Sequence, residues 1–204
     1  YEIPLRLVGS EMCIRDSTTL VAFHGCPLRC KYCLNPQSLH SEGIWKNYDC
    51  EQLYEEVRQD ELYFLATNGG ITFGGGEPCL QSDFIYEFRQ LCGQEWQLSV
   101  ETSLNVTQEN IEKLVPVVDS YIIDIKDINN TIYQKYTGKN NEKVLHNLQY
   151  LIEHGKNEQI IVRTPVIPAY NTENDVDNSI RLLKEMGIIQ FDRFTYKLSL
   201  IHIS

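Results

Sequence analysis

The chain has 204 residues, 42% of them hydrophobic, which is enough apolar material for one sizeable core but not for two. Its 18 basic and 28 acidic side chains give a formal charge of -10 with no block of lysine or arginine, so no surface for nucleic acid or an anionic membrane is indicated. The chain shows no secretory signal and no apolar run of about 18 residues, so we expect a cytoplasmic protein.

The two ends of the chain differ in character from the rest. Residues 1–17 and 198–204 resemble translated sequencing-adaptor peptides, so we expect both to be non-native and assign no functional residue within them. The predicted domain therefore spans residues 18–197.

Six short segments rich in β-branched and aromatic residues alternate with helical patterns. The predicted strands are residues 18–24, 71–74, 97–101, 121–126, 160–167 and 191–197. Apolar side chains keep a helical spacing over 84–92 and 144–152, with Gly155 and Gly187 as expected helix stops and Thr107 as an expected N-cap. Strands that alternate with helices predict an α/β protein in which right-handed crossovers connect one parallel sheet.

Polar residues gather after four of the predicted strands. A loop with three cysteines follows the first strand, and a glycine run that ends at Glu77 follows the second. Glu101 and Thr102 end the third strand, and Asp124 and Lys126 end the fourth. Because the carboxyl ends of parallel strands share one rim of the sheet, we expect these residues to lie together at a functional site.

The stretch FHGCPLRCKYCLNP places Cys26, Cys30 and Cys33 on one compact loop. A structural zinc site needs four ligands, and the chain has no second CxxC pair. Three thiolates can hold three irons of a cubane iron–sulfur cluster and leave the fourth iron open for a non-protein ligand. Two alternatives stay open, zinc completed by His24 or His40 and free thiols without a metal. The scattered cysteines are expected to be small buried hydrophobes, namely Cys50, Cys79 and Cys92.

The CxxxCxxC spacing, with Tyr32 before the last cysteine, resembles the radical S-adenosylmethionine (radical SAM) superfamily. The resemblance implies a partial (β/α)6 TIM-like barrel and a [4Fe-4S] cluster on Cys26, Cys30 and Cys33, with Tyr32 shielding one side. It further implies that the open iron binds S-adenosylmethionine, whose reductive cleavage gives a 5'-deoxyadenosyl radical that abstracts hydrogen.

The segment TFGGGEP resembles the GGE motif of the same superfamily. By this match, Gly75, Gly76 and Glu77 bind the cofactor where its methionyl amino group approaches the strand end. Glycine suits such a place, because a residue without a Cβ lets the backbone come close to a ligand and adopt a positive φ.

Four further segments resemble one branch of the superfamily, the glycyl-radical-enzyme activating enzymes typified by pyruvate formate-lyase activating enzyme. They are VETSLNV, YIIDIKD, YQKYTGKNNEKVLHNLQYL and IIVRTPVIPAYN, and the resemblance runs from about Thr18 to Lys197. Two family features are not matched: a D-G-P-G-x-R motif before the first strand, and a histidine where Lys197 stands. Residues 34–70 contain Cys50 as their only cysteine, so the chain resembles the type without a ferredoxin-like insert.

The same resemblance assigns roles to polar side chains of the later strands. Lys126 and Arg163 are implied to lie near the S-adenosylmethionine carboxylate, its ribose or the substrate peptide, as catalytic and cofactor-binding residues. Glu101, Thr102 and Asp124 are implied to line the cofactor site and bind a monovalent cation. An alternative stays open, in which Asp124 and Lys126 form a structural ion pair and Arg163 pairs with an acidic neighbour.

The function that the resemblance implies is an oxygen-sensitive oxidoreductase that takes a Cα hydrogen from a glycine of a partner glycyl-radical enzyme. The implied setting is anaerobic, with flavodoxin or ferredoxin as the electron donor. Two other functions stay open: a radical SAM enzyme that acts on a small molecule, as in deazapurine biosynthesis, and a metal-binding module without catalysis. The YTG segment disfavours the first, and the glycine run and the DIK strand disfavour the second.

Overall fold

The computed structural model describes residues 3–12, 17–40 and 46–196, with side chains from Thr18 onward. Its centre is one sheet of eight strands in the order β3-β1-β2-β4-β5-β6-β7-β8. Six strands run parallel: β2 (Ser17–Phe23), β4 (Gly70–Gly75), β5 (Gln97–Thr102), β6 (Ser120–Asp124), β7 (Ile160–Val166) and β8 (Gln190–Thr195).

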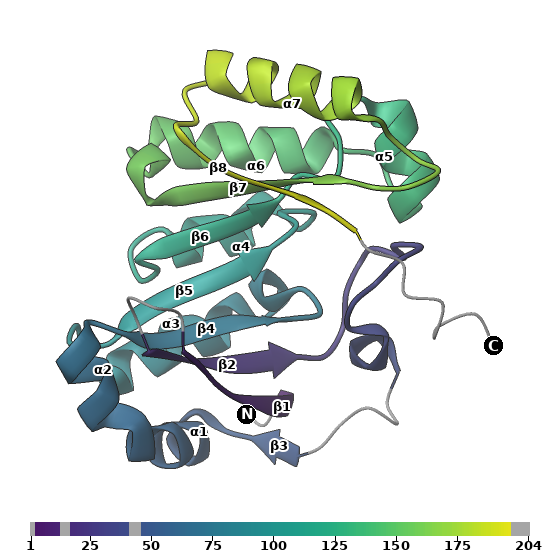
Figure 1. The fold of residues 1–204 in the computed structure, drawn as a ribbon. Helices are drawn as coiled ribbons and strands as arrows, with labels where there is room; N and C mark the ends of the chain where they lie inside the picture. Colours follow the sequence, from purple (N-terminus) through teal and green to yellow (C-terminus); the bar gives the residue numbers. More distant parts are fainter. Residues whose placement is uncertain (1–2, 13–16, 41–45, 197–204) are drawn as a thin grey trace.

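The sheet is open and has the strand order of a partial TIM-like barrel. Its six parallel strands lie side by side in chain order, with helical connections between them, as in a (β/α) barrel. Among the described strands, β3 and β8 lie at opposite edges and do not pair (Figure 1). The expected α/β class and the six expected parallel strands are confirmed.

The fourth parallel strand is shorter than the sequence predicted. β6 ends at Asp124, and only the N–H of Ile125 continues the pairing, donating to the carbonyl of Arg163 at 3.0 Å. Lys126 therefore lies in the loop beyond the strand, not within the strand. The end expected for the sixth strand, Lys197, lies outside the described residues.

Two antiparallel strands extend the sheet at the β2 edge, and the sequence predicted neither. β1 (Ile3–Met12) pairs with β2, and β3 (Lys46–Tyr48) pairs with β1. β3 is too short to show a periodic pattern, and β1 falls in the segment that we expected to be non-native. That expectation and the domain limits 18–197 stay predictions, and residues 198–204 lie outside the described part of the chain.

Helices and short 3-10 turns form the connections. The α-helices are α1 (Cys50–Val57), α2 (Glu61–Thr67), α3 (Ser82–Cys92), α4 (Gln108–Leu114), α5 (Asn130–Thr137), α6 (Glu142–Glu153) and α7 (Glu173–Glu185). The 3-10 turns are η1 (Pro36–Leu39), η3 (Arg58–Asp60), η4 (Pro78–Gln81) and η5 (Asn157–Gln159). The two expected helices are confirmed as α3 and α6.

The expected helix signals hold with one difference. Gly155 and Gly187 follow α6 and α7 with φ of 72° and 104°, which a residue without a Cβ adopts readily. Thr107 stands at the N-cap position of α4, but its side chain does not bond to the helix backbone. Its hydroxyl accepts instead from the Asn110 amide at 3.1 Å, so the helix start is fixed through a side chain.

The core lies between the sheet and the helices α3, α4 and α6, which Figure 1 shows behind the strands. Apolar strand residues fill it: Val21, Phe23, Ile71, Phe73, Leu98, Val100, Tyr121, Ile123, Ile160 and Val162. Each such side chain contributes about 1.5–3 kcal/mol when it is fully buried. Cys50, Cys79 and Cys92 are buried, as expected for small hydrophobes.

One charge lies inside this core. Arg89 of α3 is 2% exposed, and its guanidinium donates to the carbonyls of Val117, Gly93 and Trp96 at 2.8–2.9 Å and pairs with Asp119. The arginine thus joins α3 to the segments that enter β5 and β6. A buried charge with this many partners is stable, but removal of the charge leaves its acceptors without donors.

We predict that Arg89→Met lowers the free energy of unfolding by about 3–5 kcal/mol, because the half-buried carboxylate of Asp119 and three carbonyls lose their buried donor. Urea denaturation followed by circular dichroism measures the change. Arg181→Met is the control, since Arg181 pairs with Glu185 on the exposed face of α7 and its loss costs about 0.5 kcal/mol or less. Equal losses in the two variants would contradict the assigned role of Arg89.

Candidate functional site

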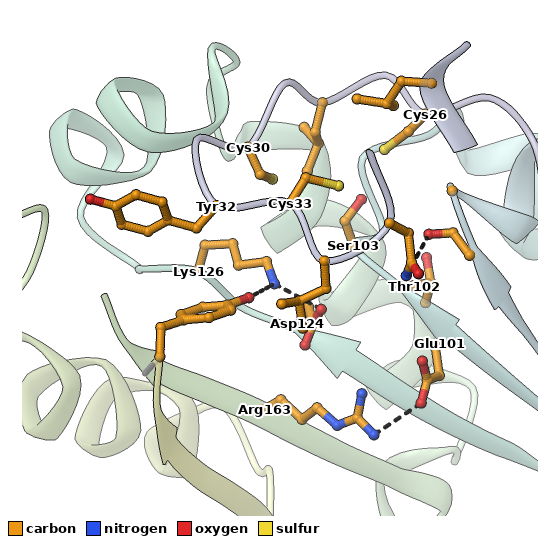
Figure 2. A pocket seen from close by; sticks show the side chains of 17 residues that line it. Cys26, Cys30, Tyr32, Cys33, Glu101, Thr102, Ser103, Asp124, Lys126 and Arg163 are labelled. Carbon is orange, nitrogen blue, oxygen red and sulfur yellow. Dashed lines mark hydrogen bonds and ion pairs between the residues drawn. The ribbon is translucent and has the colours of Figure 1, made fainter. Parts of the chain in front are cut away.

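A pocket opens at the carboxyl ends of the parallel strands, and Figure 2 shows the side chains around it. It brings together all but one of the predicted site residues: Cys26, Cys30, Tyr32, Cys33, Gly75, Gly76, Glu101, Thr102, Asp124, Lys126 and Arg163. Glu77 is not among the described residues that line it. The sequence did not single out six others that do: Leu28, Leu34, Asn35, Leu39, Ser103 and Tyr196.

The cysteine loop, residues 24–35, is held on one side by the C-terminal end of α5. The N–H of Arg29 donates to the carbonyl of Thr137 at 2.9 Å, and the N–H of Lys31 donates to that of Tyr136 at 3.2 Å. The last carbonyls of a helix have no partner within the helix, so they are free to bind the loop. The YTG segment thereby fixes the backbone between the first and last cysteine, a role that its sequence alone did not reveal.

The three cysteines of this loop are partly buried and line the same pocket. Burial raises the pKa of the Cys26 thiol to about 12 and that of the Cys30 thiol to about 11, although the charge of Lys126 opposes the rise at Cys30. Such thiols keep their protons at neutral pH until a metal displaces them. Metal binding at this loop would therefore release protons.

The three thiols come from one loop and line one pocket. Within residues 17–40 and 46–196, no three His, Cys, Asp or Glu side chains are grouped to hold one metal ion. Three thiolates can bind three irons of a cubane iron–sulfur cluster and leave the fourth iron open.

The glycine run packs directly against the cysteine loop. The N–H of Gly76 donates to the carbonyl of Phe23, and the N–H of Glu77 donates to that of Gly25, both at 2.8 Å. A Cβ on Gly76 would lie 2.3 Å from the Gly25 oxygen, so only glycine permits this approach. Gly75, with φ of 88°, turns the chain out of β4 toward the loop.

The carboxylate of Glu77 is fully buried beneath the pocket. It accepts from the hydroxyls of Thr102 and Ser103 at 2.5 and 2.6 Å, and from the N–H groups of Ser103 and Cys79 at 2.9 and 3.2 Å. Four donors compensate the desolvation of the charge. Glu77 therefore ties the end of β4 to the turn after β5, and its side chain faces that turn, not the pocket.

The aspartate that ends β6 and the lysine two residues later form a pair at the pocket wall. The Lys126 ammonium lies 2.8 Å from the Asp124 carboxylate and donates to the Tyr196 hydroxyl at 3.4 Å (Figure 2). Burial disfavours the charge of Lys126, but Asp124, Tyr196 and Cys30 together outweigh burial and raise the pKa of Lys126. The pocket therefore carries a fixed positive charge at this wall.

The arginine of β7 forms a second pair. Arg163 lies 2.9 Å from the carboxylate of Glu101 on β5 and 3.7 Å from that of Asp192 on β8. The ion pairs considered as an alternative are therefore present for both basic residues. The ion pairs do not decide between a structural role and a role in binding cofactor or substrate, because the residues of both pairs also line the pocket.

The three residues expected at a cation site differ in what their oxygens do. The Glu101 carboxylate binds Arg163, and the Thr102 hydroxyl binds Glu77. One carboxylate oxygen of Asp124, Oδ1, is buried and has no hydrogen-bond partner in the described part of the chain. An unpaired buried carboxylate oxygen is costly, and a bound cation would satisfy it.

Tyr32 packs into an aromatic cluster from three segments. Its ring lies 5.7 Å from that of Tyr170 and 6.2 Å from that of Tyr136, and the latter two rings are 5.1 Å apart. Tyr170 comes from the loop before α7 and Tyr136 from α5. Tyr32, which we expected beside the cysteines, therefore packs against two further tyrosines. Tyr136 lies in the YTG segment and Tyr170 in the IPAYN segment, so these two motifs were the part of the sequence that could have indicated the cluster.

Comparison with known proteins gives the family. The sequence profile of the Radical SAM superfamily matches residues 20–189, which is most of the chain. The chain belongs to the radical SAM superfamily, and membership implies a [4Fe-4S] cluster and S-adenosylmethionine as cofactors.

Curated relatives of the chain are named as activating enzymes. The chain is 38% identical over 148 residues to the (2S)-3-sulfopropanediol dehydratase activating enzyme of Klebsiella oxytoca, covering 71% of this chain and 46% of that protein. It is 29% identical over 175 residues to the pyruvate formate-lyase 1-activating enzyme of Escherichia coli (strain K12), covering 82% of this chain and 69% of that protein. The chain spans about half the length of the first of these relatives.

A solved structure supports the fold. SuiB from Streptococcus suis matches with a TM-score of 0.65 and 15% sequence identity, over 87% of this chain and 39% of that chain. At this identity the likeness concerns the fold alone. Among the described helices of the present protein, none is both long and apolar enough to cross a membrane.

We predict that Glu77→Ala lowers the free energy of unfolding by about 3 kcal/mol or more, because buried donors lose their acceptor. Urea denaturation of the metal-free protein measures this loss without involving any cofactor. Glu112→Ala is the control, since Glu112 is exposed on α4 and accepts only from Gln108, so its loss stays within about 0.5 kcal/mol. A Glu77 variant as stable as this control would show that the carboxylate does not hold the turn.

Proposed function

We propose that this chain is the core of a glycyl-radical-enzyme activating enzyme. Its reaction is the reductive cleavage of S-adenosylmethionine, followed by removal of a Cα hydrogen from a glycine of a partner glycyl-radical enzyme. The observation that carries the proposal is the meeting of three cysteine thiols and a glycine strand end at one pocket, in a chain whose curated relatives are named as activating enzymes.

Cys26, Cys30 and Cys33 hold the [4Fe-4S] cluster in this proposal. With S-adenosylmethionine bound, the reduced cluster supplies the one electron that splits the cofactor into methionine and a 5'-deoxyadenosyl radical, which takes hydrogen from the glycine and leaves as 5'-deoxyadenosine. The residues of the chain position the cofactor and the glycine. They also keep the site dry, because Tyr32 and the two tyrosines packed on it cover one flank of the loop.

The methionyl end of S-adenosylmethionine lies along the strand end at Gly75 and Gly76. Main-chain atoms there are accessible because neither residue has a side chain. Glu77 acts indirectly, by holding the turn at Thr102 and Ser103 in place. Its proposed role thus changes from a cofactor contact to a positioning residue.

Lys126 and Arg163 supply positive charge on the opposite wall of the pocket. We assign them to the carboxylate and ribose of S-adenosylmethionine or to the backbone of the substrate peptide, which present oxygen acceptors. Asp124, through its unpaired oxygen, is the principal ligand of a monovalent cation, with Glu101 and Thr102 beside it. The open edge of the sheet leaves a path for a glycine loop of the partner protein.

The proposal also includes an electron donor, an oxygen-free setting and a location in the cell. Flavodoxin or ferredoxin delivers the electron, the setting is anaerobic because exposed iron–sulfur clusters react with oxygen, and the location is the cytoplasm. The domain responsible spans residues 18–197.

The proposal predicts that Cys33→Ala abolishes formation of 5'-deoxyadenosine, since the cluster loses one of its three ligands. The assay is anaerobic: reconstitution with iron and sulfide, reduction with dithionite, addition of S-adenosylmethionine and chromatography of the products. Cys92→Ala is the control, because Cys92 is buried in α3 and does not line the pocket; it should keep the brown chromophore and full cleavage.

The same reaction mixtures test the partner. With added pyruvate formate-lyase or a (2S)-3-sulfopropanediol dehydratase, the unaltered protein should generate a glycyl radical signal in the electron paramagnetic resonance spectrum, and Cys33→Ala should not. Cleavage without a radical on any glycyl-radical enzyme would favour a small-molecule substrate. Turnover by Cys33→Ala would overturn the cluster assignment itself.

Arg163→Met should raise the KM for S-adenosylmethionine by about tenfold to a hundredfold, because a charge-assisted hydrogen bond contributes roughly 1.5–3 kcal/mol. Arg193→Met is the matched control, since Arg193 also pairs with two carboxylates, those of Glu173 and Asp177, but does not line the pocket. If Arg163 has only a structural role, the two variants will lose stability while both keep the KM of the unaltered protein.

A further inference from the structure

The cysteine loop and the segment that supports it contain no carboxylate, although the chain as a whole is strongly acidic. Residues 24–40 and 128–141 contain no aspartate or glutamate, whereas an even spread of the 28 acidic residues over 204 positions would place about four there. The same two segments contain the basic residues Arg29, Lys31, Lys135 and Lys139. Each of the two segments therefore carries a net positive charge, whereas the chain as a whole is negative.

The fold brings the two segments together. The backbone hydrogen bonds from Arg29 and Lys31 to the end of α5 place the loop residues beside the turn that carries Lys135 and Lys139. All four side chains are exposed. We call these four residues the basic surface. Figure 1 shows the parts that form it, α5 and the loop after β2, on the same side of the sheet.

The charges of the basic surface are not neutralised by the protein. In the described part of the chain, none of its four side chains forms an ion pair, whereas Lys113, Arg181 and Arg193 each pair with a carboxylate. Arg29 donates to the carbonyls of Cys26 and Leu28, so its guanidinium is fixed over the loop.

Two simpler explanations account for part of this pattern only. Arg29 and Lys31 offset the negative charge of a thiolate-bound cluster, but Lys135 lies in the last turn of α5 and Lys139 just after the helix, and both are exposed. Lys135 stands in the last turn of α5, where a cation favours the helix dipole. Neither explanation requires that acidic residues be absent from both segments.

The basic surface is separate from the pocket. None of its four residues is among the described residues that line the pocket, although the loop that carries Arg29 and Lys31 also carries the three cysteines. A protein bound there would contact the loop on the side that packs against α5, through side chains that do not line the pocket.

We propose that the basic surface is the docking site of an acidic protein that donates single electrons to the group held by the cysteines. The inference rests on the proposed function, which requires one electron per cleavage. In the transfer, the reduced flavin or iron–sulfur centre of the donor is oxidised by one electron, and the cysteine-bound group is reduced by one; no atom or proton moves. The chain as a whole has the same sign of charge as an acidic donor, whereas the basic surface has the opposite sign, so charge favours this partner at this site.

The chain offers a closely matched pair of variants, Lys135→Glu and Lys184→Glu. Both lysines stand in the last turn of a helix and lie over an aromatic ring, Lys135 over Tyr170 at 5.6 Å and Lys184 over Phe191 at 5.8 Å. Both changes reverse one charge, and both remove a cation from the end of a helix and from the face of an aromatic ring. They differ in place, because Lys184 lies near the amino end of β8, at the opposite edge from the cysteine loop.

The experiment measures formation of 5'-deoxyadenosine with reduced flavodoxin and, separately, with excess dithionite. With flavodoxin, we expect Lys135→Glu to raise the apparent KM for the donor by about fivefold. The double variant Lys135→Glu with Lys139→Glu should raise this KM further. The control Lys184→Glu should leave it within about twofold of the value for the unaltered protein. The affinity for oxidised flavodoxin, measured by titration, should fall in parallel and should weaken with added salt in the unaltered protein. With dithionite, all variants should cleave S-adenosylmethionine equally.

Other outcomes separate the two proposals. If dithionite produces no 5'-deoxyadenosine in the unaltered protein, the proposed function is wrong and the donor role falls with it. If dithionite works but Lys135→Glu and Lys184→Glu have the same KM and affinity for flavodoxin, the proposed function stands and the docking site is wrong. The docking site is also overturned if dithionite works while neither reduced flavodoxin nor reduced ferredoxin supports cleavage.

Discussion

Glu77 connects the ends of three strands, and the pocket depends on this connection. Its N–H binds the carbonyl of Gly25 after β2, its own backbone continues β4, and its carboxylate binds Thr102 and Ser103 after β5. A carboxylate inside a protein is stable only with several donors, and Glu77 has four. Because the same residue holds the cysteine loop through its backbone and the β5 turn through its side chain, the distance between these two parts of the site is fixed.

The rest of the site is arranged around this fixed core. The end of α5 supports the cysteine loop from one side, and the glycine run supports it from the other, so the loop is held by backbone groups that do not depend on side-chain rotamers. Charged side chains then line the pocket in two pairs, Lys126 with Asp124 and Arg163 with Glu101. Paired charges remain ionised in a partly buried pocket, and they are available to a polar cofactor that exchanges one partner for another.

Much of this architecture follows from sequence patterns. The apolar segments predicted the six parallel strands although their burial differs: β4 is buried on both faces, β5 and β6 bury alternate residues, and β8 is largely exposed. The strand order then made the carboxyl ends converge. The patterns failed where the physical cause is not local. The buried Arg89 was missed because a single basic residue in an amphipathic helix resembles a surface residue, and β3 was missed because three residues show no period. Lys126 was assigned to a strand that ends at Asp124, since apolar alternation continues through Ile125.

The sequence by itself determined the chemistry of this protein: three thiols at a spacing that a cluster requires, a glycine run that ends a strand, and basic and acidic side chains at the ends of later strands. These are properties of neighbours along the chain. Only the tertiary structure decided that Glu77 faces the β5 turn, that α5 supports the cysteine loop, and that Arg29, Lys31, Lys135 and Lys139 lie on neighbouring segments. Those arrangements depend on hydrogen bonds between backbone groups far apart in the chain, and because every residue carries such groups, they leave no signal in the composition.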